Sequence, residues 1–278
     1  MISDQKPTPA TVTIDTTDWL KTAAIILVAI DHFGFFFVEE ADWWSVVGRL
    51  AAPVFFFLIG FARTTTVPLS WIVLGVILTL LESWNADWDW VTPNILLSLA
   101  LLRAVRPGVL GLLERHGWLA FTALVLGLLA VLDVTAPVVD YGASGWLWAL
   151  FGLCQRMYVD SCPIPGGHQA MQARKPGLQA ISRPDLMRLS ACAVAATVYL
   201  WREQLEFEFS GLQLAGCIIG IGTLCAVLVM FRRGPSAIQP PQPIAMVLHF
   251  TGRHTLEIYA VQLAGSELAI KLFPGLGV

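Results

Sequence analysis

Beyond the aspartate that opens it, three ionisable side chains lie in the first long apolar stretch of the chain, DWLKTAAIILVAIDHFGFFFV. Lys21 stands near its start, whereas Asp31 and His32 lie in its second half. An α-helix turns about 100° per residue, so Lys21 and His32 return to within roughly 20° of one face, about 16 Å apart along the axis. Both can therefore line one cavity, where an imidazole near a carboxylate has the composition of a general base. Asp31 is about 100° away on the helix and faces a neighbouring helix.

A second apolar stretch, SVVGRLAAPVFFFLIGF, carries Arg49 near its start. A hairpin between the two stretches brings Arg49 to a depth similar to that of Asp31 and His32. An ion pair between Asp31 and Arg49 would satisfy both charges. That pair could equally lock two helices together without any chemistry. We therefore take His32 as the main catalytic candidate, with Asp31 and Arg49 beside it.

The last apolar stretch, TGRHTLEIYAVQLAGSEL, contains four polar side chains that could support the site. Arg253 and Glu257 are spaced i, i+4, which predicts an ion pair on one helix face. Tyr259 and Gln262 follow within the same apolar run. Such groups more often form interhelical hydrogen bonds than take part in chemistry. We expect Arg253, Glu257, Tyr259 and Gln262 to surround the reacting groups.

The segments that carry these residues are predicted to be helices that cross a membrane. The 278 residues are 56% hydrophobic and 13% charged, with a mean hydropathy of +0.68, whereas soluble domains carry about a quarter charged residues. Apolar runs of about 17 to 22 residues recur along the chain, as transmembrane helices require. The sequence predicts an all-α, polytopic transmembrane bundle of about nine or ten helices, one domain over residues 18–278. The expected spans are 18–38, 46–64, 68–84, 91–106, 117–134, 143–160, 186–203, 211–231 and 252–273.

Charge in the turns predicts how the bundle is oriented. With a cytoplasmic N-terminal tail, residues 1–17, the turns on that side hold most of the Lys and Arg residues, as the positive-inside rule requires. The opposite turns are acidic and hold most of the tryptophans, which favour the membrane interface. Residues 160–185 are rich in Gly, Pro and basic residues and predict a cytoplasmic loop. The polar tail lacks the features of a cleavable signal peptide. We expect an integral protein of the bacterial inner membrane.

Several functional classes have no support in the sequence. The chain contains no P-loop, G-x-S-x-G elbow, H-E-x-x-H motif or dinucleotide fingerprint. Its five cysteines show no Cys/His ligand spacing, so we expect no metal site. No nucleic-acid partner is expected, and membrane lipid is the expected surrounding. Basic residues of the inner turns could hold a cofactor's phosphates, although the positive-inside rule alone accounts for them.

Three segments together resemble a known family. The combination of DWLKTAAIILVAIDHFGFFF, GRLAAPVFFFLIGFART and TGRHTLEIYAVQL is similar to the TraX family, within the wider transmembrane acyltransferase group. That group includes the acyltransferase 3 family and heparan-alpha-glucosaminide N-acetyltransferase. The resemblance is clearest over residues 18–65 and 250–265. Members of the group share a basic residue and an intramembrane His with ten residues between them, which Lys21 and His32 match.

The resemblance implies an acyltransferase that uses cytosolic acetyl-CoA or another acyl-CoA. His32 would be the base or a transient acyl carrier, and Arg49 would stabilise charge or position the substrate. The acceptor would be an amine or hydroxyl of a sugar, lipid or peptide at the outer face. Cofactor-binding candidates are the basic residues Lys21, Arg63, Arg103 and Arg106. One departure is Gln262, where the family typically has a His; glutamine can form hydrogen bonds but cannot transfer protons.

Two other functional classes stay open. Asp31, His32 and Glu257 could relay protons in a proton-coupled transporter, although the sequence shows no internal repeat and no paired broken helices. A non-catalytic membrane subunit that retains the acyltransferase fold would explain Gln262. The acyltransferase interpretation is preferred because it accounts for Lys21, His32 and Arg49 together.

Overall fold

The computed structural model describes residues 13–38, 42–162, 183–273 and 275. Eleven helices occupy this part of the chain, and the only extended pairing in it is an isolated bridge between Asp15 and Pro235. The predicted all-α class is therefore confirmed. The expected loop at 160–185 falls mostly outside the described residues. The helices are α1 (Thr16–Phe37), α2 (Asp42–Gly48), α3 (Ala51–Phe61), α4 (Leu69–Asn85), α5 (Ile95–Ala130), α6 (Leu132–Thr135), α7 (Gly142–Ser161), α8 (Pro184–Phe207), α9 (Gly211–Met230), α10 (Gln242–Arg253) and α11 (Thr255–Leu272).

Four helical stretches are long and apolar enough to cross a membrane, which supports an integral membrane protein. They are Thr16–Phe37, Trp43–Phe61, Ile95–Ala130 and Gly211–Met230, and α4 is a shorter apolar helix. On α9, the side chains of Leu212, Ile219 and Met230 are 72%, 69% and 72% exposed. Exposed apolar faces of this kind suit contact with lipid. The total of nine spans stays a prediction.

The predicted spans 91–106 and 117–134 are the two arms of one long helix, α5. Gly117 interrupts the helix with φ of 51°, a backbone conformation that glycine adopts without steric cost. Pro107 also lies inside α5, where it cannot donate a backbone hydrogen bond. The predicted turn over residues 107–116 is wrong, because these residues are helical and the interruption lies at Gly117.

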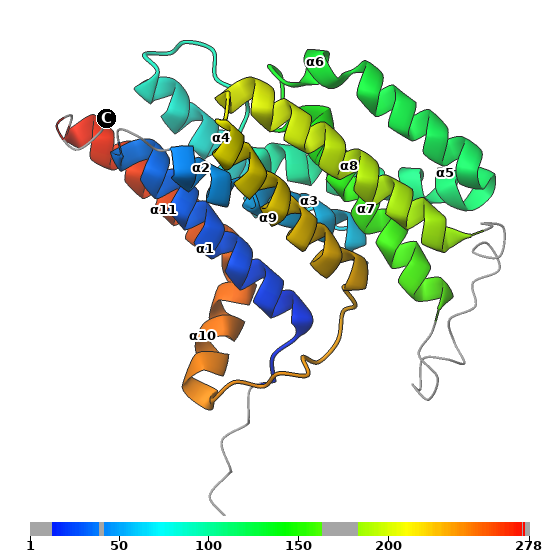
Figure 1. Ribbon diagram of the computed structural model, residues 1–278. Helices are drawn as coiled ribbons and strands as arrows, with labels where there is room; N and C mark the ends of the chain where they lie inside the picture. The colour runs from blue at the N-terminus through cyan, green and yellow to red at the C-terminus, as the bar shows by residue number, and fades with distance from the viewer. Residues whose placement is uncertain (1–12, 39–41, 163–182, 274, 276–278) are drawn as a thin grey trace, which may run out of the picture.

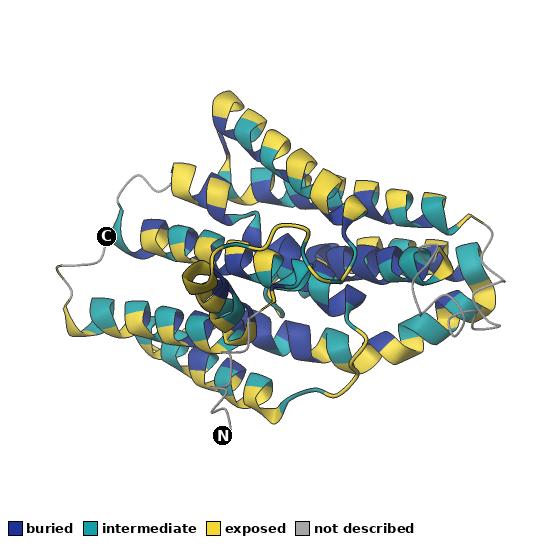
Figure 2. Cartoon of the chain, turned by 90° about the horizontal axis from the view of Figure 1, so that it is seen from below, coloured by how far each residue is buried: buried dark blue, intermediate teal, exposed yellow. Residues whose placement is uncertain are grey.

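Helices α3 and α7 cross at the centre of the bundle, and α7 also packs against α8 (Figure 1). A Cβ atom on Gly60 would collide with the backbone of Ala149, and one on Gly152 with the backbone of Phe57. The two glycines therefore let the helix backbones approach each other. Figure 2 shows buried residues concentrated in the middle of the bundle, with exposed residues along the outer helices.

This crossing matters for the site because α3 and α7 each connect two polar regions. Arg49 lies just before α3 and Arg63 just after it. Tyr141 lies just before α7, and Asp160 lies in its last turn. The close contact between α3 and α7 therefore sets where both regions lie relative to each other.

Candidate functional site

A cavity of about 1110 Å³ runs between α1, α3, α4, α5, α7 and the corner between α10 and α11. Eight of the eleven predicted site residues line it, which supports the prediction that Lys21 and His32 share one cavity. Arg49, Arg106 and Gln262 do not line it. The lining residues among the predicted set are Lys21, Asp31, His32, Arg63, Arg103, Arg253, Glu257 and Tyr259.

His32 is half-buried against aromatic side chains. Its ring centroid lies 5.9 Å from that of Tyr259 and 6.1 Å from that of Phe36. Its Nδ1 atom is buried and has no hydrogen-bond partner among the described residues. Asp31 does not orient it, because the Asp31 carboxylate accepts a hydrogen bond from Arg49 instead. Adjacent residues on a helix point about 100° apart, which explains this division.

The predicted ion pair between Arg49 and Asp31 is present, with 2.9 Å between Arg49 Nη2 and Asp31 Oδ2. Arg49 Nε also lies 3.8 Å from Glu203 Oε2 of α8, and Nη1 lies 3.5 Å from the Tyr141 hydroxyl oxygen. The guanidinium packs over the Phe207 ring at 4.7 Å. We call Asp31, Arg49, Asp140, Tyr141, Tyr199, Glu203 and Phe207 the Arg49 cluster.

The Arg49 cluster borders a second, smaller cavity of about 130 Å³. Arg49 and Glu203 line this smaller cavity, while Asp140 and Tyr141 line both cavities. The sequence therefore predicted correctly that Arg49 lies level with Asp31. It did not predict that Arg49 lines the smaller cavity instead of the main one. Of the described residues that line the main cavity, Asp31 and Tyr141 contact the Arg49 side chain.

The other end of the main cavity is lined by cations, which we call the basic end: Lys21, Arg63, Arg103, Arg156, Arg232, Arg233 and Arg253. Lys21 Nζ donates to the Gly252 carbonyl oxygen at 3.1 Å. Arg63 Nη2 pairs with Asp160 Oδ1 at 2.6 Å, and Arg103 Nη2 donates to Thr64 Oγ1 at 2.5 Å. Arg106 instead donates to the Thr64 carbonyl oxygen from a buried position outside the cavity.

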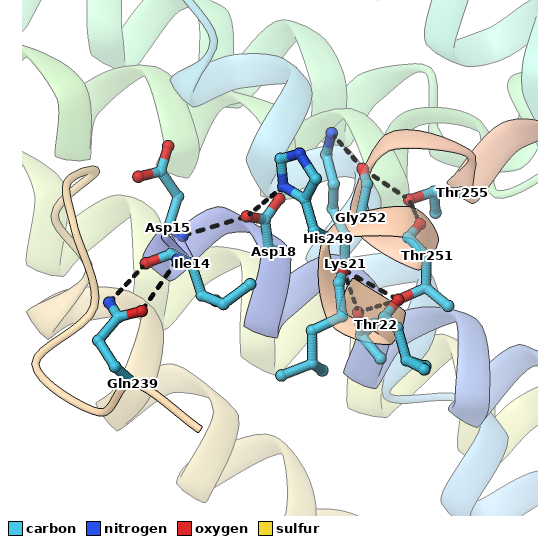
Figure 3. A network of polar contacts seen from close by, with 12 residues as sticks. Ile14, Asp15, Asp18, Lys21, Thr22, Gln239, His249, Thr251, Gly252 and Thr255 are labelled. Atoms are coloured by element: carbon cyan, nitrogen blue, oxygen red, sulfur yellow. Dashed lines mark hydrogen bonds and ion pairs between the residues drawn. The ribbon is translucent and has the colours of Figure 1, made fainter. Parts of the chain in front are cut away.

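The basic end is held by contacts between residues 14–22 and residues 232–252, and Figure 3 shows part of this network. We call residues 231–241, which join α9 to α10, the strap. Thr16 donates from its hydroxyl to the Arg232 carbonyl oxygen, and its backbone N–H donates to Gly234. Thr22 forms a hydrogen bond with Thr251 of α10 at 2.5 Å. These contacts place Arg232 and Arg233 beside Lys21.

The polar residues of the last helices separate into different roles. Tyr259 lines the main cavity, whereas Gln262 Nε2 donates to the Val28 carbonyl oxygen of α1 at 3.4 Å. The predicted Arg253–Glu257 ion pair is wrong. Glu257 lies 4.0 Å from His254 instead, because α10 ends at Arg253 and the chain bends there before α11. Gln262 therefore ties two helices together rather than facing the reacting groups.

Sequence reasoning missed several residues that shape these cavities. Asn94 is buried just before α5, where a polar residue ahead of an apolar run is an N-cap signal. Glu203 is 4% exposed within α8, although its acidic neighbourhood suggested an outer turn. Asp140 is half-buried and follows an apolar segment with no pattern that predicts a place between two cavities. No group of three potential metal ligands occurs within the described ranges.

The TraX protein family model matches residues 16–161, which run from α1 to α7 and include His32, Arg49, Arg63 and Arg103. An uncharacterized protein of Rickettsia prowazekii (strain Madrid E) is 36% identical over 84 residues, which is 30% of this chain and 34% of that protein. The match thus spans about a third of that relative. No solved structure matches the chain. Because the family model covers more than half of the 278 residues, the chain belongs to the TraX family.

Proposed function

We propose that this protein is a membrane acyltransferase that moves an acetyl or similar group from acyl-CoA to an amine or hydroxyl acceptor. The observation that carries the proposal is the main cavity, which has cations at one end and His32 toward the other. Phosphate groups need cations, and acyl transfer to a nucleophile needs a base, so one cavity supplies both requirements.

The basic end would bind the phosphates of acyl-CoA. Arg233 and Arg253 are exposed and form no ion pair within the described residues, so their charges are free for an anionic ligand. Lys21 is occupied only by a carbonyl oxygen, which a phosphate oxygen can replace. The apolar wall between the ends, including Phe55, Leu58 and Leu99, suits the uncharged arm that carries the thioester.

At the other end, His32 would act as a general base. It removes the proton of the acceptor as the acceptor's nitrogen or oxygen bonds to the thioester carbon, and the carbon–sulfur bond breaks. The proton then passes to the departing thiolate. General-base catalysis of this kind contributes about 10²- to 10⁴-fold. Asp31 and Arg49 would hold α1 against the turn before α3, so that His32 keeps its position in the cavity.

Location in a bacterial inner membrane, with the N-terminus in the cytoplasm, belongs to the same proposal. The basic end would then open toward the cytosol, where acyl-CoA is made. An acceptor sugar, lipid or peptide amine would reach His32 from the side of Asp140 and Tyr141. Those two residues line both cavities, which supports a path from the smaller cavity.

The test is release of the acyl group from labelled acetyl-CoA by purified protein in nanodiscs, with wild type, His32→Ala and Lys21→Ala compared. We expect His32→Ala to lose at least about 10²-fold in rate and Lys21→Ala to weaken CoA binding. His116→Ala is the matched control, because His116 is exposed on α5 away from both cavities. Wild-type rates in His32→Ala contradict the mechanism. No transfer and no CoA binding by wild type would favour a non-catalytic subunit or a transporter.

A further inference from the structure

The side chain of Tyr259 lines the main cavity beside His32. Tyr259 comes from α11, is 9% exposed and lines the cavity wall. Its ring centroid is 5.9 Å from that of His32, with the ring planes tilted by 54°. A group bound at His32 therefore lies within reach of the tyrosine side chain.

Asn94 determines which way the Tyr259 hydroxyl hydrogen can point. The Asn94 side-chain oxygen accepts from the Leu96 backbone N–H at 3.2 Å, so its amide nitrogen must face the other way. That nitrogen lies 3.2 Å from Glu82 Oε1 and 3.1 Å from the Tyr259 hydroxyl oxygen. The Asn94 backbone N–H is also fixed, because it donates to Thr79 Oγ1 at 2.9 Å. The orientation of the amide is thus set by several partners at once.

An amide nitrogen can only donate, so the Tyr259 oxygen accepts and its own hydrogen must be used elsewhere. No acceptor for that hydrogen is present among the described residues. The hydrogen is therefore free to be donated to a group bound in the cavity that Tyr259 lines. The bond from Asn94 also withdraws electron density from the tyrosine oxygen, which strengthens it as a donor.

We propose that Tyr259 donates this hydrogen bond to the thioester carbonyl oxygen as negative charge develops there, and that Asn94 is a positioning residue for it. The inference rests on the proposed acyl transfer. During the step, the acceptor atom bonds to the carbonyl carbon and the carbon–sulfur bond breaks. The acceptor's proton passes through His32 to the thiolate, while Tyr259 keeps its own proton throughout. The charged oxygen is stabilised without any proton transfer from the tyrosine.

The experiment measures kcat and KM for acetyl-CoA together with the melting temperature of each variant in nanodiscs. Tyr259→Phe removes only the hydroxyl, and we expect kcat to fall about 10²- to 10³-fold with little change in KM. Tyr158→Phe is the matched control, because Tyr158 lies outside the cavity and stacks under Arg188 through its ring. That control should keep the wild-type kcat.

Asn94→Asp tests the positioning role separately. A carboxylate at this position accepts the Tyr259 hydrogen and turns it away from the cavity, so kcat should fall as far as in Tyr259→Phe although the hydroxyl is still present. The double variant should lose no more than either single one, because both changes remove the same hydrogen bond.

The outcomes separate the inference from the proposed function. Wild-type transfer that depends on His32 but is unaffected by Tyr259→Phe overturns the inference and leaves the proposed function standing. A loss found only in Tyr141→Phe, the other tyrosine that lines the cavity, assigns the donor to Tyr141 and also overturns it. A loss in Tyr259→Phe with full activity in Asn94→Asp overturns the positioning role. No transfer by wild type itself rejects the proposed function and the inference together.

Discussion

The basic end of the main cavity and the Arg49 cluster use positive charge in opposite ways. In the Arg49 cluster, one guanidinium faces Asp31 and Glu203, approaches the Tyr141 hydroxyl and covers the Phe207 ring. At the basic end, seven cations line a shared space, and the only carboxylate paired with any of them among the described residues is Asp160, with Arg63 and Arg156. The arginine in the cluster faces two carboxylates, whereas most cations at the basic end have no carboxylate partner among the described residues.

This difference separates a structural use of charge from a binding use. Buried charges are tolerated when they are paired and hydrogen-bonded, and removal of one partner is then costly. Half-exposed cations cost little to keep and contribute little to stability. We therefore expect the Arg49 cluster to determine stability and the basic end to determine ligand affinity.

The largest expected effect comes from Arg49→Ala. It leaves Asp31 and Glu203 buried without their counter-charge, and we expect a loss of about 3 to 5 kcal/mol in the free energy of unfolding. Denaturant or thermal unfolding in detergent measures it. Arg233→Ala at the basic end is the comparison and should leave stability within about 0.5 kcal/mol of wild type. Equal losses in both variants would erase the distinction between the two regions.

A smaller effect is expected where α3 and α7 cross. Gly152→Ala places a methyl group against the backbone of Phe57, which cannot move as a side chain can, so we expect a loss of about 1 to 3 kcal/mol. Gly108→Ala in α5 is the matched control, because nothing lies within 4 Å of its added Cβ atom. Since the crossing joins both regions, Gly152→Ala should also weaken CoA binding. Unchanged stability would show that the helices have room to separate.

At the basic end, we expect Lys21→Ala to weaken CoA binding about tenfold, which corresponds to about 1.4 kcal/mol. Equilibrium binding of labelled CoA at two salt concentrations measures it, and higher salt should reduce the difference from wild type. Arg115→Ala removes an exposed cation outside the cavity and serves as the control. The comparison fails if Arg115→Ala weakens binding as much as Lys21→Ala does, because general surface charge would then be sufficient.

The smallest expected effect is a pH dependence from Asp140, in the loop before α7. Burial raises its pKa to about 7, while the charge on Arg49 opposes the rise. The folded protein then binds a proton that the unfolded chain releases above about pH 4, so stability should fall as pH rises from about 4 to 7. The slope should stay below about 1.4 kcal/mol per pH unit.

The slope is measured by unfolding midpoints across that range in wild type and Asp140→Asn, which should have a shallower dependence. Asp133→Asn, which removes a carboxyl group that is 82% exposed, should match wild type. A slope in Asp140→Asn equal to that of wild type would mean that the Asp140 carboxyl is already ionised across this range in the folded protein.

Apolar length predicted most of the fold, because a helix in lipid must satisfy its own backbone. The predicted spans fall on helices, and the Asp31–Arg49 pair followed from depth and charge alone. Contacts between segments far apart in the sequence could not be predicted from apolar length and charge. Glu203 reaches Arg49 from α8, and Asn94 reaches Tyr259 from the start of α5. The bend at His254 also invalidated the i, i+4 rule for Arg253, since that rule assumes one continuous helix.

The pairing of Thr16 with Arg232 also has a consequence for synthesis of the protein, because 216 residues separate the two. Thr16 leaves the ribosome long before Arg232 does. Helix α1 therefore lies in the membrane for a time without this contact. Arg232 and Arg233 take their places only after α9 has been made. A nascent chain stopped after α7 would hold His32 and Arg49 but would lack the strap and Tyr259. The cavity therefore takes its full lining only after the segments that follow α7 have been made.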